Sequence, residues 1–472
     1  MTIFRRPSHA AAAGDPIPFA HDGATHLFYL SSPPGTQDYP DRVRTSWQHV
    51  VSTDLVRWDE RPTAVEPGTP GDVDAGGIWT GSVVEHDGVF HLFYTGHDPS
   101  SATPQTICVA TSTDLETFTR SGENPVLAPV AGCEDVDWRD PYVFWNADEG
   151  RWWMLIAARR AVGPRWRRGV IMLATSEDLL RWTVEDEPFY DPGTTYCPEC
   201  PEMWELGGRW YLVYSRFSED VGTVYRVADS PRGPFRTPTD DALGGRRWYA
   251  AKSAPTGDGR VFFGWVHDRV GEGPRQRWLW GGDFAAPRIV TAAQDGSLVS
   301  RPADVYATSA DPLGELDQDL GAPARRRTQV LADDLPRRVV LDLAFTLGDT
   351  AVVGLDLLDD DDRGFGVRLS SRTGRVELTQ EPRPLDDFWA DLTGRLSDYR
   401  EVDGAVLDHA RLSRVGPQVT ARAVLDGELL EVYVDDAVAL TWRVPRAAPL
   451  RAEVFAEDGV AHVRARAAQI VD

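Results

Sequence analysis

The sequence predicts an all-β protein: a five-bladed β-propeller followed by a C-terminal β-sandwich. Two observations carry this prediction. A strand motif recurs five times between residues 21 and 266, and from about residue 327 it gives way to short alternating strands with polar turns. No long apolar pattern of helical period interrupts the repeat. A single large sandwich would explain the strands but not the repetition.

The repeated motif is a glycine-containing turn followed by aromatic and aliphatic residues, which is typical of a hairpin feeding a buried strand. Its copies are HDGATHLFYL at 21, HDGVFHLFYTG at 86, DEGRWWMLIAA at 148, LGGRWYLVYS at 206 and GDGRVFFGWV at 257. Successive copies lie about 50 to 65 residues apart, as expected for propeller blades built from short strands. A second motif, a Ser/Asp turn closed by an aromatic residue, follows in STDLVRW at 52, STDLETF at 112 and SEDLLRW at 176.

The change of pattern divides the chain into two predicted domains. Residues 1–300 form the propeller and carry the candidate catalytic residues. The stretch 301–326, with its Pro, Ala and Asp residues, is the predicted linker. Residues 327–472 form the sandwich, with alternating strands such as RRVVLDLAF and LLEVYVDD.

Charge and composition limit the partners of this protein of 472 residues. Its net charge of −24 disfavours nucleic acid, an anionic membrane surface and acidic carbohydrate. A neutral small molecule, such as an oligosaccharide, is the simplest partner. The N-terminus shows no signal peptide and no apolar run approaches the length of a membrane span, so we expect a cytoplasmic protein.

No metal or cofactor is expected. Cys197 and Cys200 have CxxC spacing, but no second pair completes a zinc site. The run Asp359–Asp362 is interpreted as a solvated hairpin tip, with a calcium site as the alternative.

The repeat places three carboxylates at matching positions. Asp15, Asp140 and Glu199 each lie 13 or 14 residues before the centre of an aromatic strand, on the strand that would line the propeller axis. Each alone would be interpreted as a turn or cap residue. Like charges crowded at one axis are costly unless function requires them, so the three predict a shared site.

Further residues near the predicted axis are candidates for substrate binding. In the other two blades the matching positions hold Ser82 and Lys252, the latter being the only lysine of the chain. Aromatic rings offer flat faces to the C–H surfaces of sugars. The predicted substrate-binding residues are Trp47, Trp79, Ser82, Arg139, Tyr249 and Lys252. Two carboxyl groups flanking an acetal carbon, one protonated and one ionised, are the apparatus of glycoside hydrolysis.

These residues resemble motifs of glycoside hydrolase family 32, which includes invertases, levanases and inulinases. RDP at 139–141 resembles the motif of its transition-state-stabilising Asp, and ECPE at 199–202 resembles its Glu-Cys-Pro-Asp motif. WTGS at 79–82 resembles its Trp-Ser-Gly-Ser motif, and WYAAKS at 248–253 and WGGDFAAPRIVT at 280–291 also have counterparts. The resemblance covers nearly the whole chain.

The resemblance implies Asp15 as nucleophile, Glu199 as general acid/base and Asp140 as the residue that holds sugar hydroxyls. The nucleophile motif differs. The family usually has Trp-Met-Asn-Asp-Pro-Asn-Gly, whereas this chain has AAGDPIP at 12–18, so only the Asp-Pro is kept. The Gln that often follows the first aromatic strand is also replaced, near Leu30.

The expected activity is therefore a retaining hydrolysis of terminal β-fructofuranosides, with fructosyl transfer to another sugar left open. One alternative is a hydrolase of another furanoside or pentoside, like the five-bladed arabinanases and xylosidases, which use water as the attacking group. Another is a non-catalytic sugar-binding protein. A separation of the Asp15 and Glu199 carboxyls of roughly 5–5.5 Å favours retention, and one of about 6.5–9.5 Å favours inversion.

Overall fold

A computed structural model describes residues 4–7, 9–257, 259–271, 277–382, 406–444 and 449–471. Within these ranges strands provide nearly all of the regular structure. The described helices are two 3₁₀ turns, η1 (Asp41–Val43) and η2 (Arg165–Arg167). Neither is long and apolar enough to cross a membrane. The prediction of an all-β fold is confirmed.

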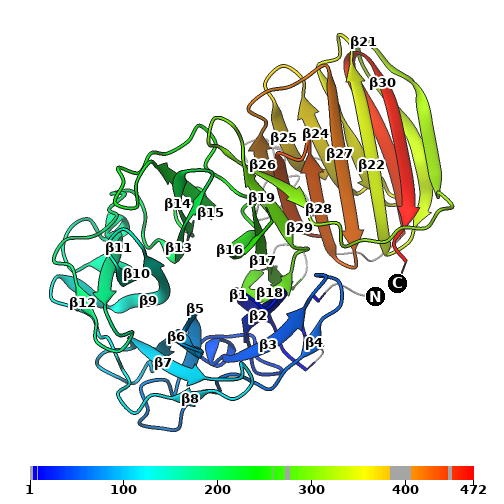
Figure 1. The fold of residues 1–472 in the computed structure, drawn as a ribbon. Coiled ribbons are helices and arrows are strands. Elements are labelled where there is room, and N and C mark those ends of the chain that lie inside the picture. The colour runs from blue at the N-terminus through cyan, green and yellow to red at the C-terminus, as the bar shows by residue number, and fades with distance from the viewer. Residues whose placement is uncertain are drawn as a thin grey trace, which may run out of the picture.

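The strands up to Pro302 form antiparallel units arranged in a ring, which Figure 1 shows along its axis. In each unit the first strand lies at the centre of the ring and later strands lie further out. We call β1, β5, β9, β13 and β16 the inner strands. The strands of the ring are β1 (Ala13–His21), β2 (Ala24–Ser31), β3 (Ser46–Ser52), β4 (Asp59–Glu60), β5 (Gly77–His86), β6 (Val89–His97), β7 (Gln105–Ser112), β8 (Thr119–Arg120), β9 (Cys133–Asn146), β10 (Arg151–Arg160), β11 (Gly169–Ser176), β12 (Thr183–Val184), β13 (Glu199–Leu206), β14 (Arg209–Arg216), β15 (Gly222–Ala228), β16 (Trp248–Thr256), β17 (Gly259–Val270), β18 (Arg277–Phe284), β19 (Arg288–Ala292) and β20 (Leu298–Pro302).

Hydrogen bonds close the ring. Strand β18 pairs with both β17 and β1, with Gly282 opposite Ala13. The last unit and the first therefore share one sheet, in the order β20-β19-β17-β18-β1-β2-β3-β4 with β16 also paired to β17. Closure of this kind leaves fewer exposed strand edges.

The two sequence motifs form the turns that they predict. Asp22 and Gly23 both have positive φ, 47° and 74°, as a two-residue hairpin turn requires. In the second motif Ser52 Oγ accepts the backbone N–H of Leu55 at 2.8 Å. Ser112 and Ser176 make the same contact with Leu115 and Leu179. These local bonds explain why the motifs recur.

The C-terminal strands form one ten-stranded sheet beside the ring (Figure 1). Strand β30 runs through both halves of it, because Arg451–Glu457 pairs with β23 and 461–469 pairs with β22. One large hydrophobic core combines side chains of both halves. The strands are β21 (Gly314–Leu335), β22 (Arg338–Leu347), β23 (Val352–Leu358), β24 (Gly364–Ser370), β25 (Arg375–Glu381), β26 (Val406–Arg411), β27 (Gln418–Asp426), β28 (Leu429–Val434), β29 (Val438–Arg443) and β30 (Leu450–Gln469).

The prediction that residues 301–326 form a linker is wrong for the second half of that range. Strand β21 begins at Gly314, which lies opposite Ala467 of β30. Most β21 side chains up to 330 are exposed, because the strand pairs only with β30 and lies at an edge. An edge strand of this kind lacks the alternating apolar pattern by which strands are recognised in sequence.

Polar and aromatic contacts join the ring to the C-terminal sheet. Arg5 Nη2 lies 2.9 Å from Asp426 Oδ2, and Arg443 Nη2 lies 2.6 Å from Asp283 Oδ2. The ring of Trp278 packs edge-on against that of Trp442, with centroids 5.4 Å apart. The C-terminal sheet therefore supports β18 directly.

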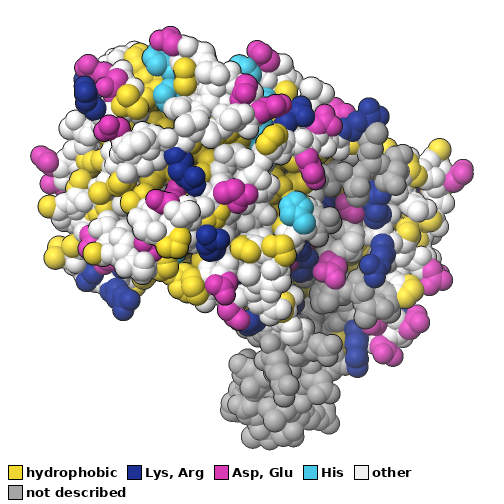
Figure 2. Space-filling view, turned by 90° about the horizontal axis from the view of Figure 1, so that it is seen from below, with side chains coloured by type: hydrophobic (Ala, Val, Ile, Leu, Met, Phe, Trp, Pro, Cys, Tyr) yellow, Lys and Arg dark blue, Asp and Glu magenta, His cyan; other side chains and the backbone are white. Residues whose placement is uncertain are grey.

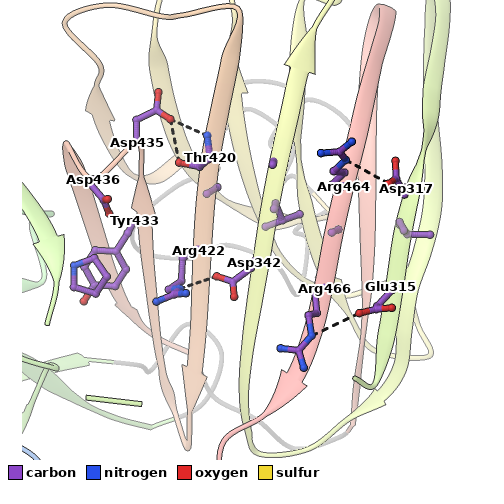
Figure 3. Close-up of a pocket in the computed structure, with 16 residues that line it drawn as sticks. Glu315, Asp317, Asp342, Thr420, Arg422, Tyr433, Asp435, Asp436, Arg464 and Arg466 are labelled. Atoms are coloured by element: carbon purple, nitrogen blue, oxygen red, sulfur yellow. Dashed lines mark hydrogen bonds and ion pairs between the residues drawn. The ribbon is translucent and has the colours of Figure 1, made fainter. Parts of the chain in front are cut away.

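Surface charges are mixed in sign. Figure 2 shows acidic and basic side chains interspersed over one face of the molecule. A groove of about 850 Å³ on the C-terminal sheet is lined in the same way (Figure 3). Its ion pairs include Arg422–Asp342 at 2.6 Å and Arg464–Asp317 at 3.3 Å. These are exposed pairs between neighbouring strands and contribute little to stability.

Candidate active site

Each inner strand carries a β-bulge at a corresponding position. A bulge re-aims the side chains around it and is common beside active sites. The residues that flank the irregularities are Gly14 and Ile17 in β1, Trp79 and Gly81 in β5, Arg139 and Tyr142 in β9, Glu199 and Glu202 in β13, and Tyr249 and Lys252 in β16.

Four bulges contain a non-glycine residue with left-handed backbone. The φ values are 38° at Asp15, 59° at Asp140, 50° at Cys200 and 47° at Ala250. Such conformations are strained and cluster at functional sites. In β1, β9 and β13 a proline follows, which has no N–H to leave unpaired in the bulge. Asp15 and Asp140 therefore occupy equivalent positions.

The predicted register is wrong by one residue for Glu199. Glu199 pairs with Ser215 before the bulge, so Cys200 is the residue equivalent to Asp15 and Asp140. Counting back from the aromatic strand missed this shift, because the count also depends on the hairpin turn, which has four residues between Asn146 and Arg151 but two between Leu206 and Arg209. The Glu199 side chain nevertheless reaches the same cavity.

The three predicted catalytic carboxylates line one cavity of about 480 Å³. They come from three different inner strands, so only the closed ring brings them together. The other lining residues are Leu30, Val43, Trp79, Gln105, Asp137, Arg139, Cys200, Phe217, Val221, Tyr249, Ala250, Trp265, His267, Trp278, Leu279 and Trp280. A concave, largely apolar cavity with a few convergent polar groups is the usual form of a ligand site.

Asp15 accepts a hydrogen bond from Trp265. Trp265 Nε1 donates to Asp15 Oδ1 at 2.9 Å. Burial, together with the negative charges of Asp140 and Glu199, raises the pKa of Asp15 to about 7, against the lowering effect of Lys252. The cavity therefore holds a titrating carboxyl group close to neutral pH.

Asp140 is buried and held from two neighbouring units. The backbone N–H of Cys200 donates to Asp140 Oδ2 at 2.8 Å, and the Asp140 N–H donates to Thr95 Oγ1 at 2.8 Å. Its side chain is only 5% exposed. These contacts fix the carboxylate at the cavity wall.

Glu199 receives a donor on each oxygen. Arg139 Nη2 donates to Oε1 at 2.9 Å, and the Tyr249 hydroxyl donates to Oε2. Burial raises the pKa of Glu199, while the Arg139 charge lowers it and the Asp140 charge raises it. The net direction is upward, which favours the protonated form that a general acid needs.

Arg139 is itself held on several sides. Its Nη1 donates to Gln105 Oε1 at 3.3 Å and to Asp137 Oδ1, and its Nη2 lies 3.4 Å from Cys197 Sγ. The guanidinium is 8% exposed. A fork held in this way can fix the Glu199 carboxyl in one orientation.

Half of the predicted substrate-binding residues line the cavity, namely Trp79, Arg139 and Tyr249. Trp47, Ser82 and Lys252 are not among its lining residues. Trp47 is fully buried and donates to Trp79 O, and Ser82 Oγ donates to Pro141 O at 2.9 Å. These side chains join neighbouring units of the ring, which residue type alone does not distinguish from facing the cavity.

Lys252 also joins two units. Its Nζ donates to Gly81 O at 2.6 Å, and the side chain is buried. Its charge nevertheless acts on the site by lowering the pKa of Asp15.

Sequence reasoning missed Trp265 and Trp280. Trp265 lies in the fifth aromatic strand, and Trp280 in a family-like segment, but nothing local indicates which way either side chain points. The structure also accounts for one change in the nucleophile motif, the glycine at position 14. A Cβ on Gly14 would lie 2.9 Å from Trp280 Cζ2, so Trp280 fills the space that a larger residue at 14 would need.

The site defines a class of protein. Carboxyl groups in an aromatic-lined cavity of sugar size, with raised pKa values on Asp15 and Glu199, can donate a proton to an acetal oxygen and stabilise the cation that forms. This is the chemistry of a glycosidase.

The family follows from comparison with known proteins. The model of the glycosyl hydrolases family 32 N-terminal domain matches residues 14–302. The chain belongs to glycosyl hydrolase family 32 and is a glycosidase, and the resemblance noted in its sequence is confirmed.

Known proteins are similar to this chain over nearly its whole length. The sucrose-6-phosphate hydrolase of Escherichia coli is 27% identical over 92% of this chain and 87% of its own. The raffinose invertase of Escherichia coli is also 27% identical, over 97% of this chain and 92% of its own. Among solved structures, fructan 1-exohydrolase IIa from Cichorium intybus superposes with a TM-score of 0.78 at 19% identity, covering 100% of this chain and 97% of that one. This likeness shows the shared fold.

Replacing Lys252 by Gln should move the acidic side of the activity profile to higher pH. The Lys252 charge lowers the pKa of Asp15, so its removal raises that pKa and Asp15 is protonated at a higher pH. We expect the acidic limb of the pH profile of kcat/KM to shift upwards by about 1 pH unit. Lys252→Arg, which keeps the charge, is the control. An unchanged profile in Lys252→Gln would show that the charge does not reach the site.

Proposed function

We propose that this glycosidase hydrolyses terminal β-fructofuranosyl units of sucrose-type oligosaccharides and fructans. The observation that carries the proposal is the convergence of Asp15, Asp140 and Glu199 in one cavity of a family 32 chain. The relatives support the fructosyl substrate. They include enzymes named fructan 1-exohydrolase, and one solved structure is a complex of such an enzyme with 1-kestose. The net charge of −24 fits an uncharged sugar better than a phosphorylated one.

The first step of the proposed mechanism breaks the glycosidic bond. An ionised Asp15 oxygen attacks the anomeric carbon, and the Glu199 carboxyl gives its proton to the departing oxygen. Asp140 accepts hydrogen bonds from sugar hydroxyls and stabilises the positive charge of the oxocarbenium-like transition state. The products are a fructosyl ester on Asp15 and a free leaving-group alcohol.

The second step releases fructose. Glu199, now ionised, takes a proton from water as the water oxygen attacks the anomeric carbon, and the bond to Asp15 breaks. Arg139 and Tyr249 are positioning residues, since both donate to Glu199. They stabilise its ionised form, which is the form that the second step needs.

A substrate panel with stereochemical analysis tests the proposal. The protein should release fructose from sucrose or 1-kestose, and NMR of the first product formed should show the β-anomer. Arabinofuranosides, xylosides and sucrose 6-phosphate are the competing substrates. Initial release of the α-anomer would support inversion, and preferential turnover of a pentoside would overturn the fructosyl assignment.

We also infer the finer architecture from these contacts. Residues 1–300 are proposed to form a five-bladed propeller that carries the catalytic carboxylates, and the C-terminal part from β21 onwards is proposed to form a β-sandwich. The repeated bulge in the inner strands and the large core shared by both halves of the C-terminal sheet support this division.

Replacing Trp442 by Ala should weaken both stability and activity. Trp442 is fully buried and packs against Trp278, which lines the cavity. The cavity created should cost about 3–5 kcal/mol in the free energy of unfolding, measured by denaturant titration. We expect kcat/KM to fall several-fold in conditions where the variant remains folded, because Trp278 loses its support. Unchanged kinetics would mean that the cavity wall does not depend on the C-terminal sheet.

A further inference from the structure

A second cavity, of about 440 Å³, lies between the inner strands of the ring. All five inner strands contribute residues that follow their bulges, from Ile17 in β1 to Lys252 in β16. From the same strands the catalytic cavity takes residues that lie before or within the bulges, and the two cavities share none of their described lining residues. They therefore lie at opposite ends of the axis along which Figure 1 shows the ring.

Two side-chain donors on the wall of the second cavity have no acceptor in the protein. The Tyr142 hydroxyl and Arg260 Nη1 make no hydrogen bond with any residue that the structure describes, although both side chains line the cavity. Burial raises the pKa of Tyr142, against the lowering effect of the Arg260 charge, so the hydroxyl keeps its proton and can donate. Unpaired donors on a cavity wall favour a ligand that supplies oxygen acceptors.

Arg260 is fixed in place before any ligand arrives. Its Nε donates to Ser253 Oγ at 2.6 Å and its Nη2 to Ser253 O at 3.1 Å, and the guanidinium lies 4.9 Å from the centre of the Trp204 ring. Glu202 Oε1 in turn accepts from Ser253 Oγ at 2.6 Å and from Trp204 Nε1 at 3.0 Å. This network leaves Nη1 as the donor for a ligand, and its rigidity lowers the entropy cost of binding.

An exposed aromatic ring lies on the wall of the same cavity. Trp145 lines it and is 48% exposed. Its ring packs edge-on against that of Trp152, which also lines the cavity, with centroids 5.3 Å apart. Aromatic rings offer flat faces to the C–H surfaces of sugars, and fixed donors pair with sugar hydroxyl oxygens. The combination of an exposed indole with unpaired donors is therefore suited to a sugar.

We propose that the second cavity is a non-catalytic binding site for a neutral sugar of mono- or disaccharide size. The charges of its wall balance, because Lys252 and Arg260 stand against Glu85 and Glu202, so an anion gains nothing there. Its volume is within the range of about 300–1,000 Å³ that is usual for small-molecule sites. Glu202 is already hydrogen-bonded on both oxygens, so the cavity lacks the pair of free carboxyl groups that glycoside cleavage needs. The inference does not depend on which glycoside the catalytic cavity cleaves.

Counting bound sucrose tests the proposal. In Asp15→Asn, which should bind sucrose without cleaving it, equilibrium dialysis with radiolabelled sucrose should show two molecules bound per chain at saturation. Adding Trp145→Ala to this variant should remove one of them. Adding Tyr142→Phe, which keeps the ring and removes the donor, should weaken the same binding event about fivefold.

Trp166→Ala is the matched control, since Trp166 is 58% exposed and lines neither cavity. It should leave both binding events unchanged. If no binding event depends on Trp145 and Tyr142, the inference is overturned. Failure of the wild type to cleave any fructoside would instead overturn the proposed function and would leave the Trp145-dependent event in place, so the two failures are distinguishable.

Discussion

Replacing Glu199 by Gln should lower kcat on sucrose or 1-kestose by at least about 10²-fold. The amide cannot give a proton to the leaving oxygen, and it cannot take one from water in the second step. Arg139 Nη2 can still donate to the amide oxygen, so we expect the fold to survive. Steady-state kinetics with melting curves measure both effects. The fall of activity at high pH, which we assign to loss of the Glu199 proton, should disappear from the residual activity.

Glu205→Gln is the matched control for this variant. Glu205 lies on the same strand, β13, and its side chain is exposed. It should keep wild-type kcat and KM. Full activity in Glu199→Gln would show that another group supplies the proton, and the assignment of the acid would then be wrong.

Replacing Asp15 by Asn should lower kcat by about 10⁴-fold or more, a typical effect of removing a nucleophile. Asn tolerates left-handed backbone at least as well as Asp, so the strained φ of 38° should be retained. The amide cannot form the fructosyl ester. The loss should therefore appear in kcat, and KM for sucrose should change little.

Trapping the intermediate makes this prediction sharper. Given a fructoside whose leaving group needs no proton, Glu199→Gln should accumulate a fructosyl adduct on the peptide that contains Asp15, detected by mass spectrometry. The double variant with Asp15→Asn should not. Asp22→Asn is the control, because Asp22 is exposed at a hairpin tip with the same kind of backbone. An adduct on another residue would contradict the assignment of Asp15.

Much of the site could be predicted because its information is local in the sequence. The hairpin turn at Asp22 and the Ser52 turn specify strands wherever they recur. Counting from those strands located Asp15 and Asp140 as equivalent residues, which their shared bulge position confirms. The same counting was wrong for Glu199 by one residue, because the hairpin turns that join the inner strands to the aromatic strands differ in length.

The predicted binding residues show a different limit. Trp47, Ser82 and Lys252 have the right chemistry and lie on or near inner strands, but their side chains bond to other units of the ring. The position of a residue in a strand determines on which face of the sheet its side chain lies. It does not determine whether that face borders the cavity or the next sheet, because the packing of the units decides which of the two lies there.

The sequence by itself determined the all-β class, the repeat and the family, and it singled out three carboxylates that line one cavity. Turn chemistry, strand period and short motifs act over a few residues, so they can be recognised without a structure. Only the tertiary structure decided which donors hold Glu199 and why residue 14 is glycine beside Trp280. Each of these contacts joins residues from different strands or units of the ring, and closure of the ring is what brings them together.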